Sequence, residues 1–255
     1  MKAIWPVIKK ELLSYFTSPI AYIVISVFLL LSGFFFYSLV WWFNSQAMQM
    51  AQNPDYYQQV NINQMVFAPL FHNLSIILLL MLPLLSMRLF SEEKKMGTEE
   101  LLFTSPVSVI QIILGKYLAS LIVLFTMLFL SAIPTIFTFI YGNPEPLPYL
   151  MGYLGLFLLG AAFLGLGVFW SSLTENQIVS AVLTFGTLLL FWVLSWAGYS
   201  ARGLWQDVLN YLSFFEHFDG MTKGILDTSD LVYYLSFAFF GLFLTNSVIQ
   251  FRRWR

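Results

Sequence analysis

Long apolar segments alternate with short polar ones along this chain. Six of them are about as long as the roughly 20 residues that a helix needs to cross the hydrocarbon core of a bilayer. The six segments are Ile20 to Phe43, Leu70 to Leu89, Val109 to Tyr141, Tyr149 to Trp170, Ile178 to Trp196 and Leu231 to Phe251. We expect Pro83 to bend the second segment. The third is longer than a bilayer requires, so it should be tilted, extend out of the membrane, or bend at Pro134.

The residues ahead of the first span have an amphipathic helical pattern. One face of the predicted helix is apolar and consists of Trp5, Ile8, Leu12, Tyr15 and Phe16. Lys10, Glu11 and Ser14 fall on the opposite face, while Lys9 lies on the apolar side and would have to extend to the headgroups. Ser18-Pro19 favours a break before the span. The pattern predicts an elbow helix lying in the membrane interface, rather than a straight extension of the span.

Composition places the chain among integral membrane proteins. Of its 255 residues, 59% are hydrophobic and only 10% are charged, against about 25% charged residues in soluble domains. We therefore expect an all-α polytopic fold in which residues 1–255 form one transmembrane domain. The first apolar run exceeds the apolar core of a signal peptide, so we expect it to be retained. No cysteine is present, which excludes disulfides and thiolate metal sites.

Lysine and arginine predict the orientation. Ten of the 12 lie on the side of the two predicted termini, namely Lys2, Lys9, Lys10, Arg88, Lys94, Lys95, Lys116, Arg252, Arg253 and Arg255. Only Arg202 and Lys223 fall on the other side, and the segment Asn44 to Pro69 contains neither residue type. The positive-inside rule then puts both termini in the cytoplasm.

The cores of the six segments contain no Asp, Glu, Lys or Arg, which argues against an ion-coupled carrier or channel. Their polarity is hydroxyl in kind and is grouped on two helix faces. One face carries Ser180, Thr184, Thr187 and Ser195, and the other carries Ser120, Ser131, Thr135 and Thr138. These hydroxyls either bond helices together or to their own carbonyls, or they line a path for an amphipathic cargo. Ala161 and Gly165 form a small-residue pair typical of helix packing.

Motifs for catalysis are missing from the sequence. A P-loop requires glycine five residues before a Gly-Lys pair, but Ile110 stands at that position ahead of Gly115-Lys116. His72 is interpreted as an interfacial residue. His217, beside Glu216 and Asp219, is either part of a polar loop with an incomplete set of ligands or part of an extracytoplasmic metal site. We therefore expect no enzyme activity, no metal site and no cofactor in this chain.

Residues 91–108 place six charges between the second and third spans. Thr98 can cap a short helix with Glu99 and Glu100 in its first turn, followed by an apolar tip, Leu101 to Phe103. Ser108 and Gln111 match a capping box that would start the third span. The residues alone leave two interpretations open: a solvated loop, or a rigid contact for a soluble partner.

Three separated motifs resemble the membrane permeases of type-2 ATP-binding-cassette (ABC) transporters. They are KKELLSYFTSPIAYI, EEKKMGTEELLFTSPVSVIQIILGKYLAS, and LSFFEHFDGMTKGILDTSDLVYYLSF followed by a last span and FRRWR. The resemblance runs nearly from end to end. Its third motif is similar to the branch of gliding-motility-associated permeases and of permeases linked to nitrous-oxide reductase maturation.

The resemblance implies a permease subunit of an ATP-driven exporter in a bacterial inner membrane. Residues 91–108 would form a cytoplasmic coupling loop, residues 1–19 the elbow, and residues 199–230 an extracytoplasmic loop or re-entrant segment. The implied contact with the ATPase comprises Glu92, Glu93, Gly97, Thr98, Glu99, Glu100, Leu101, Leu102 and Phe103, and the implied elbow residues are Lys9, Lys10, Glu11, Tyr15 and Phe16. Independently of the resemblance, the hydroxyls that would line a path in the second interpretation above are Ser131, Thr135, Thr138, Ser180, Thr184 and Thr187.

The resemblance also implies the partners. Two ATPase subunits would hold ATP and Mg and would act on this chain together with a second membrane subunit, identical or related. The bilayer and an extracytoplasmic auxiliary protein complete the expected set, and nucleic acid is not in it. An ATP-driven mechanical or assembly device with the same architecture is the alternative function.

Overall fold

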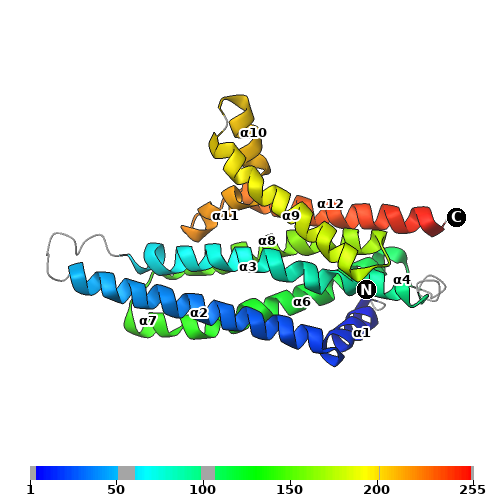
Figure 1. The fold of residues 1–255 in the computed structure, drawn as a ribbon, viewed down its shortest axis with the longest axis horizontal. Coiled ribbons are helices and arrows are strands. Elements are labelled where there is room, and N and C mark those ends of the chain that lie inside the picture. The colour runs from blue at the N-terminus through cyan, green and yellow to red at the C-terminus, as the bar shows by residue number, and fades with distance from the viewer. Residues whose placement is uncertain (1–3, 51–60, 99–106, 201, 254–255) are drawn as a thin grey trace.

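The computed structural model describes residues 4–50, 61–98, 107–200 and 202–253, and this part of the chain is helical with no strands (Figure 1). Its helices are α1 (Ile4–Thr17), α2 (Pro19–Met50), the π-helical turn η2 (Asn63–Phe67), α3 (Ala68–Ser86), α4 (Arg88–Lys95), α6 (Val109–Thr135), α7 (Phe137–Tyr141), α8 (Pro146–Leu173), α9 (Gln177–Ser200), α10 (Leu204–Leu212), α11 (Phe214–Thr222) and α12 (Thr228–Arg253).

The six predicted spans are confirmed. Within the described residues, six helical stretches are long and apolar enough to cross a membrane, and each contains or nearly contains one predicted segment. They are Pro19–Gln49, Asn63–Lys95, Val109–Tyr141, Pro146–Leu173, Gln177–Gly198 and Thr228–Arg252. The second is longer than predicted because α4 continues α3 beyond Met87 as a charged helix. The chain is therefore an all-α, multi-pass membrane protein.

Local sequence signals fix several helix ends where they were expected. Helix α1 ends before Ser18, and α2 begins at Pro19. Proline is tolerated at the first position of a helix because an N–H there would have no partner within the helix. The predicted capping box is present, because the Ser108 side chain accepts from the Gln111 amide and the Gln111 side chain accepts from Ser108. The third span is interrupted at Ile136, between α6 and α7, two residues after Pro134.

Helix α8 is the centre of the bundle. It packs against α3, α6, α9, α11 and α12, and 78% of its most apolar stretch is buried. The contact with α12 is close because both helices have glycine there. A Cβ atom on Gly241 would lie 2.4 Å from the carbonyl oxygen of Gly165. With a larger residue at position 241, the two helices could not pack this closely. The packing role expected of Gly165 is confirmed.

The two ends of the bundle differ. Helices α1 and α4 and the C-terminal end of α12 lie at one end, and α7 lies at the other (Figure 1). Helix α9 leans away from the bundle and leads to α10, which stands off it and has no buried residue. Helix α11 returns to pack against α8. The segment from residue 199 to 230 is thus largely occupied by two short helices joined at Ser213.

Candidate functional site

The charged helix α4 is held against the C-terminal end of α8 by a buried serine. Ser171 Oγ accepts hydrogen bonds from the amides of Phe90 (2.9 Å) and Ser91 (3.1 Å) and donates to the carbonyl oxygen of Met87 (2.9 Å). The interruption of the helix at Met87 leaves amide groups there without their usual partners, and Ser171 provides one. Lys94 adds a second attachment, because its ammonium group donates to the carbonyl oxygen of Ser172.

A cluster of four charged residues joins α4 to α1 and α6. We call Lys10, Glu11, Glu93 and Lys116 the charge cluster. Glu93 lies 3.0 Å from both ammonium groups, through Oε1 to Lys10 and through Oε2 to Lys116, and Glu11 Oε1 lies 2.8 Å from Lys116 Nζ. The signs alternate along the chain of contacts, so the cluster carries no formal net charge.

Burial makes this cluster unusual. The Lys116 side chain is only 1% exposed, and those of Glu11 and Glu93 are 10% exposed, whereas that of Lys10 is 61% exposed. Lys116 also lies over the Phe90 ring, 5.1 Å from its centroid. A lone buried ammonium would be strongly unfavourable, and the two carboxylates offset that cost. Neutralisation therefore depends on α1, α4 and α6 being together.

The orientation of α1 corrects the prediction for its polar face. Its buried residues are Ile8, Glu11 and Tyr15, whereas Trp5 is 66% exposed. The prediction that Glu11 faces away from the apolar side was wrong, because it assumed that the carboxylate would be exposed to solvent. Its partner, Lys116, lies 105 residues away in the sequence.

One contact outside the charge cluster also holds α1 in place, and a pKa shift supports one within it. The Tyr15 hydroxyl donates to the carbonyl oxygen of Leu85 (3.0 Å), and burial, with the nearby charge of Glu11, raises the pKa of Tyr15, so that this donor keeps its proton. Burial opposes the charge of Lys10, but the hydrogen bond and charge of Glu93 outweigh it and raise the pKa of Lys10. The elbow is thus fixed to the second and third spans by hydrogen bonds and charge.

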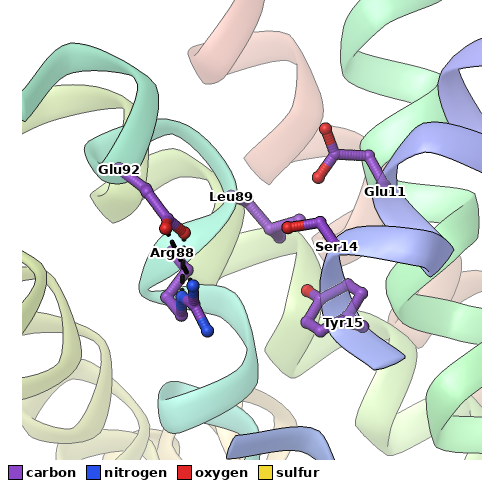
Figure 2. Close-up of a pocket in the computed structure, with 6 residues that line it drawn as sticks. All are labelled: Glu11, Ser14, Tyr15, Arg88, Leu89 and Glu92. Carbon is purple, nitrogen blue, oxygen red and sulfur yellow. Dashed lines mark hydrogen bonds and ion pairs between the residues drawn. The ribbon is translucent and has the colours of Figure 1, made fainter. Parts of the chain in front are cut away.

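A small polar pocket lies between α1 and α4 (Figure 2). Its volume is about 20 Å³, which is about the space of one water molecule. Its lining residues are Glu11, Ser14, Tyr15, Arg88, Leu89 and Glu92. Arg88 binds Glu92 through two hydrogen bonds of 2.8 Å, and its third nitrogen donates to Ser18 Oγ at 2.6 Å. Arg88 therefore connects α4 with the junction of α1 and α2.

The backbone conformation at the C-terminal end of α4 explains why residue 97 is a glycine. The amides of Gly97 and Thr98 donate to the carbonyls of Lys94 and Glu93, each at 3.0 Å, and Gly97 has φ of +68°. This is the Schellman arrangement, which requires a left-handed residue and so favours glycine. The Thr98 hydroxyl donates to the Glu93 carbonyl at 3.3 Å. The rest of the predicted contact, Glu99 to Phe103, lies outside the described residues.

The structure therefore separates the predicted contact residues. Glu93 faces the charge cluster, and Glu92 binds Arg88 with 29% of its side chain exposed. Lys9 is exposed on α1, as is Phe16 at 39%. Sequence reasoning missed this role of Lys116, which was considered only as half of a failed P-loop and as one of the charges that predict the orientation. The signal was available, since Lys116 is the one charged residue in the segment Val109 to Tyr141.

The candidate lining hydroxyls mostly bond to carbonyls of their own helices. These bonds run from Ser131 to Leu128, from Thr135 to Ala132, from Thr138 to Thr135, from Thr184 to Ser180 and from Thr187 to Leu183. Ser180 and Thr184 are fully buried between α9 and its neighbours, while Thr187 is half-buried. Such bonds are those that the packing interpretation expects.

The histidines lie at the other end of the bundle. Both ring nitrogens of His217 are engaged, Nδ1 with Asp230 Oδ1 (2.7 Å) and Nε2 with the carbonyl oxygen of Tyr211 (3.0 Å). His72 Nε2 lies 3.3 Å from Asp219 Oδ1. Among the described residues, no three His, Asp or Glu side chains converge as metal ligands would. The two hydrogen bonds of His217 thus join α11 to α12 and α10.

Comparison with known proteins identifies the family. A search of curated proteins finds no significant match. The model of the family described as "ABC-2 family transporter protein" matches residues 5–251, which is nearly the whole chain. Its members are non-catalytic membrane components that associate with an ABC ATPase and a membrane subunit. The six spans, the helical fold and this match agree, and the chain belongs to the ABC-2 family as a membrane permease component of an ABC transporter.

Proposed function

We propose that this permease couples ATP hydrolysis in a separate ATPase to the export of a substrate across a bacterial inner membrane, with both termini in the cytoplasm. Two ATPase subunits hold ATP and Mg, and two membrane subunits, identical or related, form the path. Ten of the 12 lysine and arginine residues support this orientation. The similarity of its third motif to the gliding-motility and nitrous-oxide reductase maturation permeases belongs to the same proposal.

The observation that carries the proposal is the position of the charge cluster. Its member Glu93 lies in the first part of residues 91–108, the segment that the family resemblance assigns to the ATPase, and the rest of that segment follows Gly97 in the sequence. Displacing α4 alone would part Glu93 from Lys116 and leave a buried ammonium with one carboxylate. Because that is unfavourable, α1 and α6 should follow α4.

The second attachment supports the same direction of transmission. Ser171 links α4 to α8, and α8 packs against most of the other spans. A force on the loop would therefore reach α1 and α6 through charge and the bundle core through hydrogen bonds. The elbow residues Lys9 and Phe16 are exposed on α1 and are available to the same ATPase.

Charge reversal in the loop tests the assignment. Glu99→Lys with Glu100→Lys should insert into the membrane normally but lose ATPase binding, or lose the coupling of hydrolysis to export, because charge complementarity to the partner is reversed. The measurements are co-purification of a Walker-motif subunit and ATP-dependent uptake of labelled cargo by inverted vesicles. Glu175→Lys, a reversal at an exposed residue between α8 and α9, is the matched control.

The outcomes separate the candidate functions. Normal binding and normal coupled activity in the double variant would refute the loop contact. ATPase binding without flux of any cargo would favour a mechanical or assembly device. Ion-driven transport by the purified permease alone would overturn both ATP-driven functions.

A further inference from the structure

A second pocket, away from the charge cluster, lies between α3, α9 and α11. Its volume is about 340 Å³, and it is lined by His72, Ile76, Trp192, Ser195, Trp196, Phe215, Glu216 and Asp219. Its α3 residues come from the half of that helix opposite α4. The volume falls within the range of small-molecule sites. None of the functions proposed above uses these residues.

One wall of this pocket is aromatic. The rings of Trp192 and Trp196 have centroids 4.7 Å apart, tilted by 52°, and Phe215 lies edge-on to Trp192 at 6.4 Å. Trp196 is 60% exposed, so part of its surface remains accessible. Indole faces attract cations through the negative side of the ring quadrupole, and tryptophan is the strongest of the aromatic residues in this respect.

The lining from α11 is also acidic. Glu216 and Asp219 lie three residues apart, hence on the same side of α11, and Glu216 is exposed. Lys223 pairs with Asp219 from the next turn, and His72 lies 3.3 Å from the same carboxylate. This side of the pocket therefore carries two carboxylates, and His72 and Lys223 both contact that of Asp219.

We propose that this pocket binds the cationic end of an amphipathic molecule, an organic ammonium group attached to an apolar body. The ammonium group lies between the Trp196 ring and Glu216, and the apolar body lies along Ile76 and Phe215. Aromatic faces combined with a carboxylate select organic cations over neutral molecules of the same shape. The binding of such a molecule does not depend on the proposed function. Its identification as the exported cargo does rest on that function.

The test uses the purified full-length permease in lipid nanodiscs, without ATPase or ATP. The probes are benzyltrimethylammonium and its neutral isostere neopentylbenzene, and binding is measured by calorimetric titration. We expect the cation to bind and the isostere to bind at least about 5-fold more weakly. Trp196→Leu should weaken cation binding by about 2-fold to 30-fold, the range of one cation–π contact. Glu216→Gln should weaken it several-fold, most strongly at low salt.

Matched controls lie elsewhere on the surface. Trp41→Leu on α2, at a tryptophan 64% exposed, and Asp207→Asn on α10 should leave the affinity unchanged. Equal binding of the two probes, or wild-type affinity in both pocket variants, would overturn the proposal and leave the polar residues as a brace between α3 and α11. Intact selective binding without ATP-dependent flux would refute only the proposed export function.

Discussion

Lys116→Met should destabilise the permease more than any single substitution of an exposed charge. The change keeps the length and apolar volume of the side chain but removes the ammonium that lies 2.8 Å from Glu11 and 3.0 Å from Glu93. Two carboxylates, each about 10% exposed, then face a site without a cation. Removing one partner of a buried ion pair costs about 3–5 kcal/mol.

The expected loss is large against the whole stability of a folded protein. The free energy of unfolding is typically about 5–15 kcal/mol. For chains of this size, 1 kcal/mol shifts the melting temperature by about 2–4 °C, so we expect Lys116→Met to melt about 6–20 °C below the wild type. The assay is thermal unfolding of the purified permease in nanodiscs, followed by tryptophan fluorescence.

Two comparison variants separate buried charge from lost packing. Lys10→Met removes the outer cation of the cluster, which is 61% exposed, and exposed pairs contribute only about 0.2–1 kcal/mol. The triple variant Lys116→Met with Glu11→Leu and Glu93→Leu removes all the buried charge of the cluster, and such replacements are often neutral or stabilising. It should therefore melt close to the wild type.

The reasoning fails under two results. A melting temperature of Lys116→Met within about 3 °C of the wild type would show that the ammonium is not buried among these carboxylates. A triple variant as unstable as Lys116→Met would show that packing, and not uncompensated charge, accounts for the loss.

Two further predictions concern the attachments of α4. Ser171→Ala removes the acceptor of the Phe90 and Ser91 amides, so the free energy of unfolding should fall by about 1–3 kcal/mol and coupled ATPase activity should decrease. Ser172→Ala should have a smaller effect, because Lys94 binds only the backbone carbonyl oxygen of Ser172. Thermal melting and ATP hydrolysis assays of the two variants check this. Because the pKa of Lys10 is raised above 10.5, its ion pair with Glu93 contributes fully at neutral pH and is lost only as the pH rises through that raised pKa. The stability difference between wild type and Lys10→Met should thus be constant from pH 7 to about 10 and shrink above that, and a difference that vanished near pH 7 would contradict the pairing.

Much of the fold was predictable because its signals are local. Apolar length alone identified six spans, since the bilayer sets the same requirement for each. The capping box at Ser108 and the break at Ser18 each depend on side chains within a few residues of the helix end. The continuation of the second span as α4 was not predicted, because the charged residues after Ser91 were interpreted as the start of a loop.

The charge cluster could not be predicted in the same way. Glu11 lies 105 residues from Lys116, and Lys10 lies 83 residues from Glu93. From a helical wheel of one helix, a glutamate is expected on the solvated face, because burying an isolated carboxylate is unfavourable. That rule fails when the packing of three helices brings a cation to the carboxylate, and hydropathy along one helix contains no information about it.

The pairing within the cluster also bears on how α4 can move. An apolar contact between α1, α4 and α6 could be at least as stable, but it would not be directional. Glu93 instead bridges two specific ammonium groups, so a small displacement of α4 breaks defined contacts at both Lys10 and Lys116. Helices joined in this way either move together or separate at a cost of several kcal/mol. The cluster therefore favours movement of the elbow, α4 and α6 as one unit, which is what an ATPase acting on the neighbouring loop would need in order to reach the membrane.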